Sequence, residues 1–273
     1  MSITRRTFVR ATVSSMAVST GMAVGVFASR SVAAALPAQT FFATSPGAAI
    51  SAVLGTDQST PDPAVELDVA GTVETADVVP VSVSTTLDDV SSITIVADKN
   101  PNPIIAHFRL DPQLPPYVAT RVRLAKSGDV RALVMAGKSV HGASKNVEIS
   151  ISGCGDPEAD AQPGPRDKTM SDAIRMKLTK ADGGVVVRAL VTHPMTPPRN
   201  PAAQGSAVSG AFINEVRAEL NGKTVLTGEW SAGVAQNPYL AFKIRQATPG
   251  DVIRLSWTDS AGNNGSSQAT VDA

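Results

Sequence analysis

The chain has 273 residues and a mass of 28.1 kDa, is 42% hydrophobic but only 4% aromatic, and carries 24 basic and 24 acidic side chains. This length is enough for one or two domains with a real core, in which branched aliphatic side chains must supply most of the burial. Residues 1–35 hold four arginines and no acid, so the remainder has 20 basic against 24 acidic side chains, a net charge of about −4. No basic tract remains, which excludes nucleic-acid binding driven by electrostatics.

Residues 1–35 have the features of an export signal. Residues 4–9 read Thr-Arg-Arg-Thr-Phe-Val, which resembles the twin-arginine motif, and a weakly apolar run over 11–29 follows. Three alanines at 33–35 offer a small-residue cleavage site. A transmembrane anchor is the alternative, but serine, threonine and glycine make the run too polar for a comfortable span. We therefore expect twin-arginine export to the periplasm, with no membrane contact after cleavage.

A short helix is predicted within the N-terminal segment 36–62. Ser45-Pro46 is a suitable start and Gly55 a suitable end for a helix of two to three turns. The polar, proline-containing stretch 56–63 then separates this segment from a β-rich region.

Short alternating apolar runs, typical of half-buried strands, recur through residues 63–155. Turn-forming clusters such as Asp98–Pro103 and Lys126–Asp129 separate them. The runs are Val65–Val69, Val79–Val83, Ile93–Ile95, Ala106–Leu110, Val122–Leu124, Val130–Val134 and Val147–Ile151. About seven such strands predict an immunoglobulin-like sandwich.

The pattern restarts after residues 156–168, whose proline, glycine and charge predict a linker. The second set of runs, within 169–273, is Ile174–Leu178, Val185–Val191, Val216–Leu220, Leu240–Ile244 and Ile253–Trp257. Asn221-Gly222 predicts a type I′ hairpin turn. The predicted fold is therefore all-β: two immunoglobulin-like β-sandwiches joined by a Pro/Gly linker, preceded by a signal peptide and one short helix.

Cys154 is the only cysteine, and Gly153 and Gly155 flank it. The alternation of the preceding strand, with Val147 inward and Glu148 outward, places Cys154 on the solvent side when it is extended past the strand. In an oxidising compartment a lone cysteine forms no internal disulfide, and a buried, inert cysteine is the alternative. The glycines leave no β-carbon beside the thiol, and we favour an exposed, reactive thiol.

Metal and catalytic roles are less favoured. The histidines are His107, His141 and His193. A cupredoxin-like copper site places cysteine, histidine and methionine in one short loop. No histidine or methionine follows Cys154 until Met170. A catalytic thiol is usually held rigidly, and Asp156 would raise rather than lower the thiol pKa. We predict no metal, no cofactor and no enzymatic activity, and a packing role for His193 at its strand end.

Several motifs in the two halves of the chain resemble those of a known pair of protein subunits. Residues 93–103 (Ile-Thr-Ile-Val-Ala-Asp-Lys-Asn-Pro-Asn-Pro), 121–126 (Arg-Val-Arg-Leu-Ala-Lys) and 152–155 (Ser-Gly-Cys-Gly) resemble SoxY. Residues 187–195 (Val-Arg-Ala-Leu-Val-Thr-His-Pro-Met), 237–240 (Asn-Pro-Tyr-Leu) and 257–262 (Trp-Thr-Asp-Ser-Ala-Gly) resemble its partner SoxZ. The chain thus resembles a SoxYZ fusion, with a SoxY-like sandwich over 63–155 and a SoxZ-like sandwich over 169–273.

The resemblance implies that Cys154 is the covalent attachment point for thiosulfate-derived sulfur and that Gly153 and Gly155 give the carrier arm its flexibility. In the family, a haem cytochrome couples thiosulfate to the thiol, a hydrolase releases sulfate, and a sulfane dehydrogenase oxidises the remaining sulfur. These enzymes and small inorganic sulfur species are the implied partners.

This chain departs from the family pattern in two ways. The family arm reads Gly-Gly-Cys-Gly-Gly at the C-terminus, whereas here Ser152 and Asp156 replace the outer glycines and the motif lies in mid-chain. Asp156 adds a negative charge beside an anionic adduct. Two alternatives therefore stay open: a SoxYZ-like carrier or adaptor that serves a quinoprotein dehydrogenase without thiosulfate, and a non-covalent immunoglobulin-like docking module.

Overall fold

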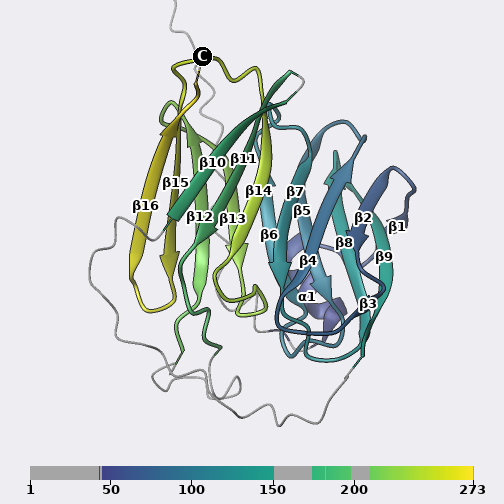
Figure 1. Cartoon of the computed structure of the whole chain (residues 1–273). Coiled ribbons are helices and arrows are strands. Elements are labelled where there is room, and N and C mark those ends of the chain that lie inside the picture. The colour runs from purple at the N-terminus through teal and green to yellow at the C-terminus, as the bar shows by residue number, and fades with distance from the viewer. Residues whose placement is uncertain (1–42, 44, 151–173, 182, 198–209, 273) are drawn as a thin grey trace, which may run out of the picture. The chain divides into compact units, whose positions relative to one another are not determined.

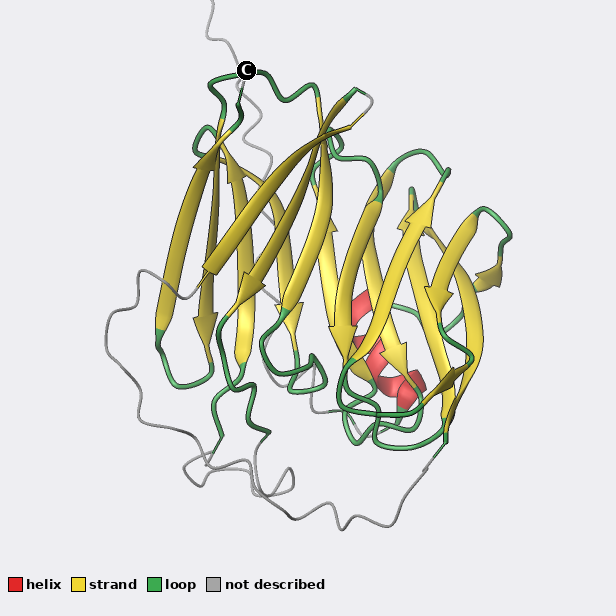
Figure 2. Ribbon diagram, in the orientation of Figure 1, coloured by secondary structure: helices red, strands yellow, loops and turns green. Residues whose placement is uncertain are grey.

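The computed structural model describes residues 43, 45–150, 174–181, 183–197 and 210–272. These residues belong to the compact unit 35–273 and form one helix and two β-sheets (Figure 2). Within them, no helix has the length and apolarity needed to cross a membrane. The all-β prediction with one short helix is confirmed.

The helix α1, Pro46–Leu54, has the predicted caps. The Oγ of Ser45 accepts a hydrogen bond from the backbone nitrogen of Ala48 at 3.4 Å, and Pro46 occupies the first turn. Gly55 ends the helix at φ 77°, a left-handed conformation that glycine adopts without strain. Ile50 is buried and belongs to a cluster with Val96, Ile104 and Leu133 of the neighbouring sheet.

The first half of the chain contributes nine strands to the two sheets. They are β1 (Thr60–Pro61), β2 (Val65–Val69), β3 (Thr72–Val73), β4 (Val79–Thr85), β5 (Val90–Ala97), β6 (Ile104–Leu110), β7 (Tyr117–Val122), β8 (Gly128–Ala136) and β9 (Ser139–Ile149). The strand over residues 139–146 and the two-residue strands β1 and β3 were not predicted from the sequence.

The described part of the second half supplies the remaining strands (Figure 1). They are β10 (Ile174–Ala181), β11 (Gly184–Val191), β12 (Ile213–Leu220), β13 (Lys223–Trp230), β14 (Tyr239–Arg245), β15 (Val252–Asp259) and β16 (Asn264–Thr270). Asn221 and Gly222 join β12 to β13 with φ values of 50° and 80°, as a type I′ turn requires, so that prediction is confirmed.

Both sheets run continuously from the first half into the second. The large sheet has ten strands, in the order β1-β9-β8-β5-β6-β13-β12-β15-β16 with β3 beside β9, and the small sheet has six, in the order β10-β11-β14-β7-β4-β2. The seams are the antiparallel pairs β6–β13 and β7–β14. Each half therefore covers edge strands that the other would expose. The predicted linker 156–168 lies outside the described residues.

The core lies between the sheets and is shared by the halves. Alternate residues of each strand point inward, so that Ile95, Phe108 and Val118 from the first half join Leu226 and Phe242 from the second in one buried cluster. Continuous burial across the seams joins the two halves into one packed body.

Candidate functional site

Strand β9 leads directly into the segment that carries Cys154. Cys154, Gly153 and Gly155 lie outside the described residues, so their roles stay predictions. The described part of β9 has the predicted alternation, with Val147 buried, Glu148 exposed and Ile149 half-buried.

The end of β9 is held on two sides. The backbone nitrogens of Glu148 and Ser150 donate to the carbonyl oxygens of Gly71 and Val73, each at 2.9 Å, because β3 pairs in parallel with β9. The nitrogen of Ile149, between them, donates to the Oγ of Ser127 at 2.9 Å. Three consecutive backbone donors are thus fixed immediately before the cysteine segment. Such fixation gives that segment a defined point of attachment.

The segment 123–127, which ends at Ser127, is itself clamped by one buried side chain. The Nδ2 of Asn100 donates to the carbonyl of Arg123, and the Oδ1 of Asn100 accepts from the nitrogen of Ala125, each at 2.8 Å. Asn100 comes from the loop between β5 and β6. The motif 93–103 therefore positions the motif 121–126, which in turn supports the root of the cysteine segment.

Arg123 also links the two halves of the chain. Its backbone nitrogen donates to Gly233 at 2.7 Å, and its Nη1 donates to the carbonyls of Met195 and Ala232, each at 3.4 Å. Met195 belongs to the Thr-His-Pro-Met motif that follows β11. Hence residues resembling SoxY and residues resembling SoxZ meet at this arginine.

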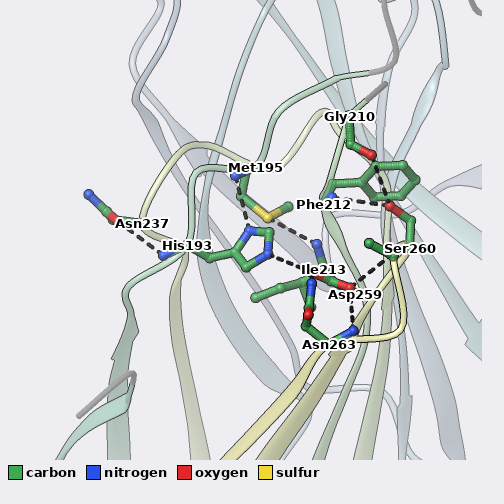
Figure 3. Close-up of polar contacts among 10 residues, drawn as sticks. His193, Met195, Gly210, Phe212, Ile213, Asn237, Asp259, Ser260 and Asn263 are labelled. Atoms are coloured by element: carbon green, nitrogen blue, oxygen red, sulfur yellow. Dashed lines mark hydrogen bonds and ion pairs between the residues drawn. The ribbon is translucent and has the colours of Figure 1, made fainter. Parts of the chain in front are cut away.

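The Thr-His-Pro-Met motif is built around buried His193 (Figure 3). The Nδ1 of His193 accepts a hydrogen bond from the backbone of Met195 at 3.0 Å, which leaves Nε2 as the donor toward the Oδ2 of Asp259 at 3.3 Å. The ring also meets Trp257 edge to face, with centroids 5.3 Å apart. The predicted packing role of His193 fits this arrangement.

Asp259 is the acceptor at the centre of the neighbouring turn. Its carboxylate accepts from the nitrogens of Ala261 and Asn263 and from the side chain of Asn263, at 2.8 to 2.9 Å. Burial alone would raise the pKa of Asp259, but the hydrogen bonds from Asn263, His193 and Ala261 outweigh it and lower that pKa below its usual value of 3.8. Asp259 is therefore an anion at neutral pH.

The described motif segments adjoin the ends of β5, β7, β11 and β15 and the start of β14, which lie at one end of the two sheets (Figure 1). Antiparallel pairing makes β5, β9, β13 and β15 run in the same direction, so they finish at the same end of the large sheet. The Arg123–Gly233 bond joins the end of β7 to this end, and a bond from the nitrogen of Asn237 to the carbonyl of His193 joins the end of β11 to the start of β14. Sequence motifs far apart in the chain thus lie at the same end of the sheets from which β9 leads to Cys154.

The three histidines occupy separate environments. His107 is buried on β6, where its Nδ1 lies 2.9 Å from the hydroxyl of Thr94. Burial, helped by the charge of Arg109, lowers the pKa of His107 to about 3. His141 lies in β9 with its Nδ1 2.8 Å from Asp62. Within the described ranges, no three His, Cys, Asp or Glu side chains are grouped to hold a metal ion.

Comparison with known protein families follows the division of the motifs. A family model described as sulfur oxidation protein SoxY matches residues 50–154, and one described as sulphur oxidation protein SoxZ matches residues 174–270. The chain therefore belongs to the sulfur-oxidation carrier proteins with a two-sheet sandwich. More specifically, it is a SoxYZ fusion, with the SoxY domain first.

Solved structures give weaker likenesses. The sulfur carrier protein SoxY from Chlorobium limicola f thiosulfatophilum is 28% identical, with a TM-score of 0.37 over 41% of this chain and 96% of that one. A beta-glycosidase from Bacteroides vulgatus is 11% identical, with a TM-score of 0.24 over 76% of this chain and 24% of that one. Bovine butyrophilin is 9% identical, with a TM-score of 0.21 over 79% and 97%. A search of curated proteins found no match. The family assignment rests on the two family models.

Proposed function

We propose that the protein is a periplasmic covalent carrier that holds thiosulfate-derived sulfur on Cys154 for oxidation by partner enzymes. The observation that carries this proposal is that the SoxY family match ends at residue 154, which is the only cysteine of the chain. The hydrogen bonds that fix Glu148, Ile149 and Ser150 support it, because they give the segment that carries Cys154 a fixed base.

The chemistry balances as a two-electron oxidation followed by hydrolysis. The Cys154 thiolate and the sulfane sulfur of thiosulfate form a disulfide bond, giving Cys–S–S–SO₃⁻, and the two electrons released pass to a haem cytochrome. Water then attacks the sulfonate sulfur, which releases sulfate and two protons and leaves Cys–S–S⁻. In this scheme the chain supplies the thiol and its presentation, and the partner enzymes carry out both reactions.

Intact-mass measurement of protein isolated from cells that oxidise thiosulfate tests the proposal. We expect mass additions for thiosulfonate and for extra sulfur on the wild-type protein, removed by a thiol reductant. The Cys154→Ser variant, which differs by one atom, should carry neither. Absence of every adduct from the wild-type protein during thiosulfate oxidation would reject a covalent carrier. Full thiosulfate oxidation with Cys154→Ala would favour a non-covalent adaptor.

The proposed location rests on residues 1–35. We expect the protein in the periplasmic fraction to have lost this segment and to begin near residue 36. Replacing both Arg5 and Arg6 with lysine should leave the full-length precursor in the cytoplasm, because the twin-arginine pathway recognises the arginine pair. Periplasmic recovery of the double variant at the wild-type level would reject this route.

A further inference from the structure

The outward face of the small sheet carries a concentration of positive charge. Strand alternation points Val187, Phe242 and Val118 into the core and places basic side chains on the opposite face. We call this the basic face and define it by Arg175 and Lys177 on β10, Arg188 on β11, Lys243 on β14 and Arg121 on β7. All are exposed except Arg121, which is half-buried. The basic face is localised on a chain whose net charge beyond residue 35 is about −4.

Two cation–π pairs cross the seam between β7 and β14. The guanidinium carbon of Arg121 lies 5.3 Å from the ring centroid of Tyr239, and the Nζ of Lys243 lies 4.8 Å from that of Tyr117. Arg121 and Tyr117 come from the SoxY domain, whereas Tyr239 and Lys243 come from the SoxZ domain. The arrangement therefore exists only when the two domains are paired through β7 and β14.

A hollow of about 360 Å³ lies beside the tyrosines. Its floor includes the small side chains of Ala119 on β7 and Ser82 on β4, which lie opposite each other. Asp68 stands at the rim on the side away from the cations. Burial, followed by the neighbouring Tyr239, raises the pKa of Tyr117, so its phenol stays a neutral hydrogen-bond donor at neutral pH.

We propose that the basic face docks an acidic protein surface, one presented by the enzymes that visit Cys154. The identity of the visiting enzymes rests on the proposed function. Charge complementarity indicates an acidic partner surface, since exposed arginines and lysines on a net acidic chain attract clustered Asp and Glu carboxylates. Tyrosine and arginine are the side chains enriched at protein interfaces and their hot spots. The hollow takes one protruding side chain of the partner, and Asp68 at its rim disfavours a second carboxylate there.

One part of the basic face, the Arg121–Tyr239 pair, lies at the end of the molecule from which β9 leads to Cys154. Arg121 lies at the end of β7, two residues before Arg123, and Tyr239 lies at the start of β14, which is at the same end of the sheet. The Arg121–Tyr239 pair therefore lies at the same end of the molecule as the root of the cysteine segment, which belongs to the other sheet.

A pair of matched arginines allows a sharp test. The Nη1 of Arg188 donates to the hydroxyl of Thr179 on the adjoining strand at 3.2 Å, and the Nη2 of Arg254 donates to the hydroxyl of Ser266 on its adjoining strand, also at 3.2 Å. Both are exposed, but Arg254 lies on β15 of the large sheet. Arg188→Glu removes one positive charge from the basic face and adds a negative one, and Arg254→Glu makes the same change elsewhere.

The experiment titrates the full mature protein against the purified haem cytochrome and the purified sulfate-releasing hydrolase of the same organism by calorimetry, at about 50 and 200 mM salt. At the lower salt we expect Arg188→Glu to raise the Kd for at least one of these enzymes about 3-fold or more, and its combination with Lys243→Glu to raise it about 10-fold or more. The wild-type Kd should rise with salt. Arg254→Glu should change it less than about 2-fold. Equal Kd values for wild type and the double variant, or equal weakening by Arg254→Glu, would overturn the proposal.

Two further measurements separate this inference from the proposed function. Intact mass of the same preparations reports the Cys154 adduct: an adduct without binding through the basic face rejects the docking surface alone, and binding without an adduct rejects the covalent carrier alone. Vesicles of phosphatidylglycerol and phosphatidylcholine are the second probe. Vesicle binding by the wild-type protein that Arg188→Glu abolishes would assign the basic face to a membrane surface and overturn the proposal.

Discussion

The side chain of Asn100 joins two backbone segments by binding the carbonyl of Arg123 with its Nδ2 at 2.8 Å. Its Oδ1 simultaneously accepts from Ala125, also at 2.8 Å, and the side chain is buried. This single amide thus fixes the segment that ends at Ser127, the hydroxyl of which receives the nitrogen of Ile149. The root of the cysteine segment depends on a residue some fifty positions earlier in the chain.

Asn100→Ala should lower the free energy of unfolding by about 2 kcal/mol, because it removes two partly buried hydrogen bonds, one to the carbonyl of Arg123 and one from the nitrogen of Ala125. Urea denaturation followed by circular dichroism measures this loss. Asn102→Ala, in the same loop and half-buried, is the matched control and should cost less than about 0.5 kcal/mol. Equal losses for the two variants would show that the hydrogen bonds of Asn100 contribute little.

Asp259→Asn should lower the free energy of unfolding by about 3 kcal/mol at pH 7, because it removes the charge that accepts from Asn263 and faces His193. The folded pKa of Asp259 is lowered, so its contribution is present above the unfolded value near 3.8 and is lost as the pH falls below that value. The difference between the variant and the wild-type protein should therefore shrink below pH 3.8. Denaturation at several pH values measures it, with exposed Asp88→Asn as the control. A difference that is constant down to pH 3 would contradict the assignment.

His107 should remain neutral in the folded protein throughout the physiological range. Its folded pKa of about 3 is below the ordinary value of 6.5, so in this interval the unfolded chain binds the additional proton. Stability is therefore complete above pH 6.5 and decreases as the pH falls toward 3, by up to about 1.4 kcal/mol per pH unit from this group.

The His107→Gln variant should reduce that pH dependence while keeping a side chain able to reach Thr94. Denaturation midpoints between pH 7 and 4 provide the measurement, and the imidazole resonances of the wild-type protein give an independent one. A His107 ring that titrates near pH 6.5 in the folded protein would contradict the assigned burial.

Local sequence signals predicted most of the strands and turns, because they depend on neighbouring residues, but the run Val122–Leu124 was wrong, since β7 is Tyr117–Val122. Ser45, Gly55 and the Asn221-Gly222 turn each specify backbone conformation within a few positions. The two-residue strands β1 and β3 are too short to show any periodicity.

The continuity of the sheets was not predictable, because strand pairing between the halves is a long-range property. The run around Phe108 indicates one strand and the Asn221-Gly222 turn indicates another after it, but neither indicates that β6 pairs with β13. The same limit applies to the site. Cys154 was singled out by its neighbours in sequence, whereas the contacts of Asn100 with Arg123, and of Arg121 with Tyr239, join residues that only the fold brings together.

We predict that the two halves unfold together, because they are joined by the β6–β13 seam at which Gly228 lies. Gly228 lies opposite Phe108, and a β-carbon added there would lie 2.7 Å from the Cγ1 of Val216 and 3.1 Å from the Cδ1 of Phe108. Gly228→Ala should therefore cost about 1–3 kcal/mol through overpacking. Because both sheets cross the seam, calorimetry of the mature protein should show one transition, and the variant should shift all of it to lower temperature. Gly71→Ala, with no atom within 4 Å of the added carbon, should leave the transition in place. Two transitions of which Gly228→Ala moves only one would instead mean that the SoxY and SoxZ domains fold independently.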